Sequence, residues 1–115
     1  MRDARGTIHW WGDSLESLRS FPKEVRIDLG QALLDVQLGR LPESQFRSMK
    51  DIGQGVFELK ARDATGAYRL IYLKKIKGVV HVLHCFQKKS QKTDSRDIGL
   101  AKKRLKEVNA FFSEQ

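Results

Sequence analysis

The 115-residue sequence has little of several residue types, and each shortage excludes a class of protein. Its single cysteine, Cys85, cannot form an internal disulfide, so the cytoplasm is the expected compartment. Two prolines and nine glycines exclude collagen-like and low-complexity chains. The longest apolar run, Leu70 to Leu73, is far shorter than the ~20 residues of a membrane span. The first residues lead into His9 without an apolar segment, so no secretory signal is expected.

What is present predicts one folded domain over residues 1–115 with an uneven charge. Hydrophobic residues make up 40% of the chain, enough for one modest core. The net charge is +8, yet residues 1–57 hold eight basic and eight acidic side chains, so residues 58–115 carry the whole excess. A chain that is basic in one half favours a polyanionic partner, such as nucleic acid or a very acidic protein; the alternative is a merely cationic surface.

Apolar periodicity predicts helices at both ends of the chain. The spacing of Asp13 and Glu16 is typical of a capping box, which would start a short helix ending near Arg19. A second helix is expected from Pro22 to Gly39, and a third after Thr93. The second and third helices each have an apolar stripe at helical spacing, formed by Val25, Leu29, Leu33 and Val36 and by Ile98, Ala101, Leu105 and Val108.

The middle of the chain predicts β-strands. Phe57, Leu59 and Ala61 alternate with polar residues, and a turn near residues 64–65 would return the chain and place Lys60 opposite Arg69. A third strand is expected over residues 79–86, and residues 46–52 could form a shorter one. The predicted fold is α+β: a small antiparallel sheet of three or four strands, with two N-terminal helices and a C-terminal helix packed on one side.

The sequence offers little for metal or nucleophilic catalysis. In residues 81–85, strict strand alternation would put His81 and His84 on opposite faces and only His81 and Cys85 on the same face. No carboxylate is placed to complete a zinc site, and there is no G-x-S-x-G or glycine-rich phosphate loop. We therefore predict no metal and no small-molecule cofactor.

Cationic side chains are the candidates for function. Lys60, Arg62 and Arg69 would share a hairpin, and a second basic run, residues 87–93, follows the last strand. Like charges opposite one another are destabilising, so without a nearby carboxylate they favour binding of an anion. The alternative is that they are solvated surface residues. By parity His84 would share a face with Phe86, which could stack on a base or cap the core.

Several segments resemble the phage-related HigB-like branch of the RelE/ParE toxin superfamily. The specific part is the F-x-K-K-[ST]-x-K-T run, here Phe86 to Thr93, and weaker matches lie at residues 56–60 and 68–72. Trp11 to Leu15 is similar to the opening of that branch, and the resemblance extends from about Trp10 to Lys106. It implies a RelE-like fold and the toxin of a type II toxin–antitoxin pair, many of which cut mRNA on the ribosome.

A cleavage mechanism without metal suits these residues. The 2′-OH of RNA can attack the adjacent phosphorus, provided that the protein stabilises charge and moves protons. Arg62 and Arg69 are the candidates for charge stabilisation, Lys60 is the candidate base, and His84 or a lysine such as Lys88 is the candidate acid. We expect the remaining RNA contacts from Phe86, Lys89, Gln91 and Lys92.

The expected partners follow from the resemblance. They are mRNA, the ribosome and a cognate antitoxin with a helix-turn-helix domain, and neither a membrane nor a small-molecule cofactor is expected. Two alternatives stay open: inhibition of DNA gyrase, as in ParE-like members, and nucleic-acid binding without catalysis.

Overall fold

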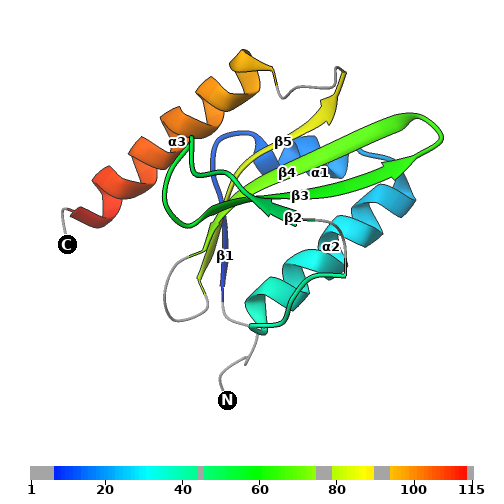
Figure 1. The fold of residues 1–115 in the computed structure, drawn as a ribbon, viewed down its shortest axis with the longest axis horizontal. Helices are drawn as coiled ribbons and strands as arrows, with labels where there is room; N and C mark the ends of the chain where they lie inside the picture. The colour runs from blue at the N-terminus through cyan, green and yellow to red at the C-terminus, as the bar shows by residue number, and fades with distance from the viewer. Residues whose placement is uncertain (1–6, 44–45, 75–78, 90–93, 114–115) are drawn as a thin grey trace.

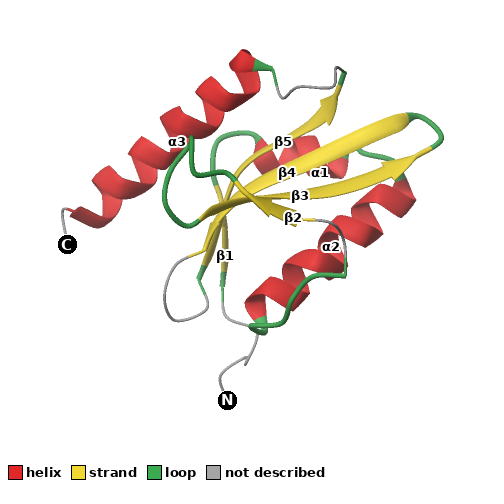
Figure 2. Ribbon diagram, in the orientation of Figure 1, coloured by secondary structure: helices red, strands yellow, loops and turns green. Residues whose placement is uncertain are grey.

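The computed structural model describes residues 7–43, 46–74, 79–89 and 94–113. Its elements are, in chain order, β1 (Ile8–Trp10), α1 (Ser14–Arg19), α2 (Lys23–Gln37), β2 (Phe46–Ser48), β3 (Val56–Asp63), β4 (Gly66–Lys74), β5 (Val80–Lys88) and α3 (Ser95–Ser113). The strands form one sheet in the order β1-β5-β4-β3-β2, shown in Figures 1 and 2. The lysine-rich sequence predicts a basic turn over residues 74–78, of which residues 75–78 lie outside the described residues.

The central hairpin has the register predicted from the sequence. In the antiparallel pair of β3 and β4, Lys60 lies opposite Arg69 and Asp63 opposite Gly66. The Asp63 carboxylate accepts a hydrogen bond from the Thr65 amide at 2.8 Å, which closes the two-residue turn. The short strand expected within residues 46–52 is β2, which pairs antiparallel with β3.

The sheet is larger than predicted and is not purely antiparallel. It has five strands, because β1 adds to the edge of β5 in parallel. The amide of Trp11 donates to the carbonyl of Val82 at 3.0 Å, and the amide of Val80 donates to the carbonyl of Thr7 at 2.9 Å. A strand of three residues is too short to show alternation, so periodicity could not reveal it.

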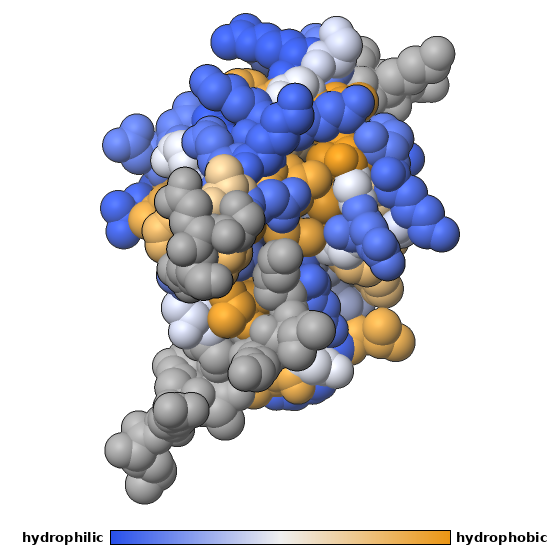
Figure 3. All heavy atoms as spheres, turned by 90° about the vertical axis from the view of Figure 1, so that its left-hand side faces the viewer, coloured by the Kyte–Doolittle hydropathy of each residue, from blue (hydrophilic) through white to orange (hydrophobic). Residues whose placement is uncertain are grey.

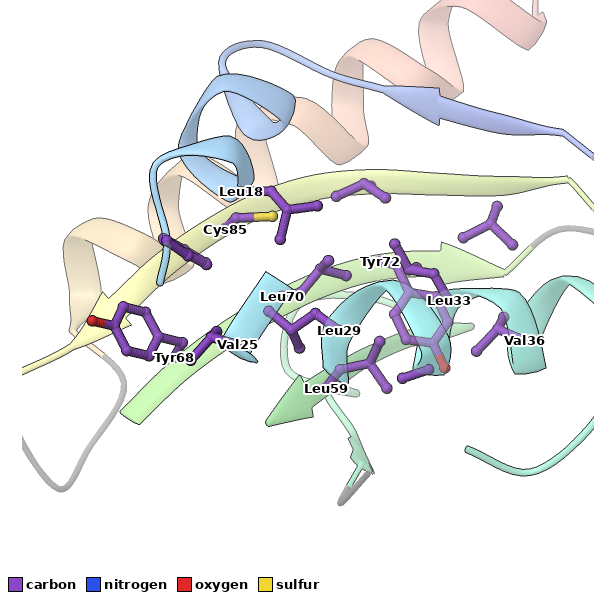
Figure 4. Packing of buried hydrophobic residues seen from close by; sticks show 14 residues of the cluster. Leu18, Val25, Leu29, Leu33, Val36, Leu59, Tyr68, Leu70, Tyr72 and Cys85 are labelled. Carbon is purple, nitrogen blue, oxygen red and sulfur yellow. The ribbon is translucent and has the colours of Figure 1, made fainter. Parts of the chain in front are cut away.

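Helices cover both faces of the sheet, which corrects the expectation of a single covered side. On one face α1 and α2 bury Leu18, Val25 and Leu29 against Leu59 and Leu70, as Figure 4 shows. On the opposite face, α3 places Ala101 and Val108 with three sheet residues, Ile71, Leu83 and Phe86. The stripes of both long helices thus face the sheet as predicted, but from opposite sides.

A β-bulge in β5 changes which side chains share a face. Tyr72 pairs with Val82 and Ile71 pairs with His84, so Leu83 is an extra residue. Strict alternation put His84 on the face of Val82, whereas the bulge turns His84 toward α3. It also separates His81, which contacts Phe112 of α3, from Cys85, which lies in the core beneath α1 and α2. The assignments of His81 and His84 to opposite faces and of His81 and Cys85 to one face were wrong for this reason. His84 and Phe86 share a face as predicted, because both follow the bulge.

The helix starts differ in how they are capped. The predicted capping box of α1 does not form: Asp13 makes no side-chain hydrogen bond to the helix amides, and its carboxylate accepts from Arg104 Nη2 at 2.8 Å. At the start of α3, the Asp94 carboxylate accepts from the Arg96 amide at 2.9 Å and so caps the helix. Asp13 therefore connects the start of α1 to α3 instead of capping its own helix.

The exposed side of α3 is basic in the middle of the helix, whereas Phe111 and Phe112 are exposed near its end. Lys102, Lys103 and Lys106 are exposed, as their positions outside the apolar stripe predict. Hydrophilic residues dominate the upper part of the molecule in Figure 3. No helix in the described part of the chain is long and apolar enough to cross a membrane.

Gly30, on the exposed side of α2, provides a test of helix propensity. A methyl group added there would have no heavy atom within 4 Å. We expect Gly30→Ala to raise the free energy of unfolding by about 0.5–1 kcal/mol, because alanine loses less backbone entropy in a helix. Urea unfolding of both proteins measures this difference. An unchanged or lower midpoint at equal slope would show that Gly30 has a role the structure does not reveal.

Candidate functional site

The candidate site is a cationic face formed by three rows of side chains across β2, β3, β4 and β5. Cross-strand partners share a face of a sheet, so the pairing register defines each row. The middle row contains Lys60, Arg69 and Phe86. Beyond it lie Arg62, Ala67 and Lys88, and on the other side lie Arg47, Glu58, Ile71 and His84. We call the charged members of these rows, Arg47, Glu58, Lys60, Arg62, Arg69 and Lys88, the cationic face.

The cationic face contains one carboxylate, which was not predicted from the sequence. Glu58 is fully buried, and its Oε1 lies 3.2 Å from Arg47 Nε and 3.4 Å from Arg69 Nε. The expectation of basic residues without a nearby carboxylate is therefore wrong. Strand parity alone could have found Glu58, because it lies two residues before Lys60 on the same face.

Arg69 is more enclosed than a solvated strand residue, since only 10% of its side chain is exposed. Its Nη1 donates to the Tyr68 carbonyl at 3.4 Å, and its Nε has only the ion-pair contact with Glu58. Burial lowers the pKa of the Arg69 guanidinium; Glu58 opposes this shift, and the charges of Arg47 and Arg62 add to it. The group stays charged at neutral pH because the pKa of an arginine lies far above 7.

Lys88 lies in the row next to Arg69, at the end of β5. Partial burial lowers the pKa of its ammonium group, the charge of Arg69 lowers it further, and Glu58 opposes the shift. Lys60 contributes in the same direction as Arg69. The lowered pKa makes the Lys88 ammonium a stronger acid than an ordinary lysine side chain.

His84 belongs to a separate polar network at the edge of the cationic face. Its Nε2 lies 2.7 Å from Asp97 Oδ1, and its Nδ1 lies 3.3 Å from Arg104 Nη1. Arginine can only donate, so Nδ1 accepts from Arg104 and Nε2 carries the proton that Asp97 accepts. Both ring nitrogens are thus engaged, and this arrangement favours a structural role that ties β5 to α3 over the predicted role as an acid.

Phe86 and the end of β5 join the cationic face to a cleft. The ring of Phe86 stacks on His84 with centroids 5.0 Å apart and is buried, so the reading as a core residue is the better one. The cleft has a volume of about 570 Å³ and lies among α1, β5 and the start of α3. Ser17, Lys88, Lys89 and Arg96 are among the residues that line it.

The other predicted site residues divide into two groups. Lys89 is exposed directly after β5, whereas Gln91 and Lys92 lie outside the described residues.

Within the described ranges, no group of three histidine, cysteine or carboxylate side chains is placed to hold a metal ion. Burial raises the pKa of the Cys85 thiol, which disfavours the reactive thiolate.

Comparisons with known proteins assign the chain to a family. The family model described as "Phage derived protein Gp49-like (DUF891)" matches residues 16–106, so the chain belongs to the Gp49-like family. An uncharacterized protein of Haemophilus influenzae Rd is 32% identical over 96 residues, which cover 84% of this chain and 83% of that protein. Among solved structures, a chain of the intact E. coli RelBE toxin–antitoxin complex is similar with a TM-score of 0.47 and 22% identity. That match covers 72% of this chain and 96% of the other.

Proposed function

We propose that this protein is the toxin of a type II toxin–antitoxin system and that it cleaves mRNA on the ribosome at the cationic face. The observation that carries the proposal is the concentration of Arg47, Lys60, Arg62, Arg69 and Lys88 around one buried carboxylate. Guanidinium and ammonium groups gathered on one surface bind phosphate oxygens. The sequence resemblance to the HigB-like branch supports RNA as the polyanion.

The proposed reaction uses the RNA itself as nucleophile. The 2′-OH attacks the adjacent phosphorus, the bond to the 5′ oxygen breaks, and the products are a 2′,3′-cyclic phosphate and a free 5′-OH. Arg69 and Arg62 stabilise the negative charge that develops on the phosphorane. Lys60, directly opposite Arg69, takes the proton of the 2′-OH. Lys88, whose pKa is lowered by burial and by the charge of Arg69, protonates the leaving oxygen.

Induced expression in growing cells distinguishes this function from the alternatives. We expect growth arrest with new RNA 5′ ends inside translated codons, and no such ends for an Arg69→Ala variant expressed to the same level. DNA-damage signalling with intact mRNA would contradict the proposal and favour gyrase as the target. RNA binding without new ends would favour a binder without catalysis.

Neutralisation by the antitoxin should depend on charge. Residues 60–106 hold fourteen basic and three acidic side chains, so we propose that an acidic antitoxin segment covers this surface. From about 0.1 M to 1 M salt the Debye length falls from ~10 Å to ~3 Å, and the complex should weaken by roughly tenfold or more. Titration calorimetry at both concentrations measures this. Equal affinity at low and high salt would contradict an acidic segment, and Lys23→Ala, in the neutral half of the chain, is the matched control.

A further inference from the structure

We propose that Glu58 is the positioning residue of the cationic face, holding Arg69 and Arg47 in the orientation in which they receive a phosphate. The cleavage test of this proposal rests on the proposed function, whereas the NMR test does not. Glu58 contributes no exposed surface, so it cannot itself touch an RNA bound on the face. Its role is therefore exerted through the arginines.

The burial of Glu58 requires compensation by partners. A carboxylate removed from water is strongly disfavoured unless it is paired. Oε1 meets that need with two guanidinium groups at once, Arg47 from β2 across the strand pair and Arg69 diagonally on β4. One carboxylate oxygen thus joins three strands, and both arginines turn their Nε edges toward it.

This geometry determines which part of Arg69 is available. Its Nε faces Glu58 and its Nη1 donates to the Tyr68 carbonyl, whereas Nη2 makes no hydrogen bond to any described residue. The guanidinium is held from two sides, and Nη2 is left to donate. A preorganised donor stabilises charge in a transition state more effectively than a mobile one, because it needs no reorganisation during the reaction.

Repulsion among the cations of the face provides a second argument for this role of Glu58. Four cations besides Arg69 lie in the three rows, Arg47, Lys60, Arg62 and Lys88, and mutual repulsion would drive their long side chains apart. The negative charge of Glu58 lies beneath the face, so it reduces this repulsion without competing for the bound anion. A surface carboxylate at the same distance would be exposed to the RNA and would repel it.

Two substitutions at Glu58 test the proposal. Glu58→Gln preserves the shape and removes the charge, and Glu58→Asp preserves the charge and withdraws the carboxylate by one methylene. For each folded variant we expect the single-turnover cleavage rate at saturating protein to fall by about tenfold or more. The concentration of protein that gives half the maximal rate should change by less than about threefold, because the phosphate contacts are retained but poorly oriented. Asp35→Asn, a buried carboxylate of α2 behind the opposite face of the sheet, is the matched control and should cleave at the wild-type rate.

The pH profile separates positioning from catalysis by Glu58 itself. If Glu58 positions Arg69, the variants keep the wild-type shape of the rate–pH curve at a lower plateau. Loss of one limb in Glu58→Gln would show that Glu58 transfers a proton and would overturn the proposal. A folded Glu58→Gln or Glu58→Asp protein that cleaves like wild type would overturn it as well.

NMR of the arginine Nε–H groups tests the same inference without any RNA. In the wild-type protein the Arg69 and Arg47 signals should be dispersed and show the relaxation of ordered groups. In Glu58→Gln both should approach the signals of mobile surface arginines. If the signals stay ordered, Glu58 does not hold the arginines, whatever the activity. If they become mobile and the wild type cleaves no RNA, the positioning role stands and the proposed nuclease function fails.

Discussion

Replacing Arg69 with alanine is expected to reduce RNA cleavage by about 100- to 1000-fold, the loss of roughly 2.7–4 kcal/mol seen when one preorganised donor is removed from a charged transition state. Arg69 lies at the centre of the cationic face, between Lys60 on β3 and Phe86 on β5. Arg69→Lys should recover only part of the rate, because an ammonium group cannot reproduce the fixed planar donors of the guanidinium. Single-turnover cleavage of a defined mRNA on ribosomes measures both variants.

The Arg69→Ala experiment needs a control for stability. Arg69 forms an ion pair with the buried Glu58, so its removal also affects the stability of the fold. Removing one partner of a buried pair costs about 3–5 kcal/mol. The double variant Arg69→Ala/Glu58→Gln removes the unpaired charge and should unfold closer to wild type while staying inactive. Wild-type cleavage by either folded variant would exclude Arg69 from the site.

Arg104→Ala should produce a large loss of stability, about 3 kcal/mol or more. Arg104 is buried; its Nη1 donates to the Leu83 carbonyl at 2.9 Å and approaches His84 Nδ1, and its Nη2 donates to Asp13. The substitution leaves the carbonyl of the bulge and the ring nitrogen without this donor. A domain of this size should lose on the order of 10 °C in melting temperature.

The neighbouring lysine provides the comparison for Arg104. Lys103 is exposed on the same helix, and Lys103→Ala should change the free energy of unfolding by about 0.5 kcal/mol or less. Asp13 contributes little to the difference because its side chain is 61% exposed and solvent screens the pair. If Arg104→Ala and Lys103→Ala have the same melting temperature, the network of Arg104 does not hold α1, β5 and α3 together.

Periodicity predicted the long elements because each has one buried stripe or alternating face. The stripe from Val25 to Val36 identified α2, and the alternation around Leu59 identified β3 together with its hairpin register. The sequence also contains a signal that both faces of the sheet are covered. Leu70, Ile71, Tyr72 and Leu73 are apolar in succession, which is typical of a strand buried on both sides.

The remaining differences come from tertiary contacts. The extra residue Leu83 is held in the bulge with its carbonyl bonded to Arg104, 21 positions later, so no local pattern could reveal it. The bulge then moved His84 to the α3 side and into contact with Asp97. At the cationic face, Lys60, Arg62 and Arg69 were brought together as predicted, and Glu58 is the member that alternation should have included.

The chemistry of the RNA ends tests the central claim most directly. Purified protein is incubated with ribosomes on a defined mRNA, and a second mRNA carries one 2′-deoxy nucleotide at the mapped cut. We predict cleavage of the first into a 2′,3′-cyclic phosphate and a 5′-OH, with no cut at the deoxy position, because the 2′-OH is the nucleophile and the cationic side chains supply the charge stabilisation. Cleavage that leaves a 5′-phosphate, or that proceeds at the deoxy position, would contradict the account.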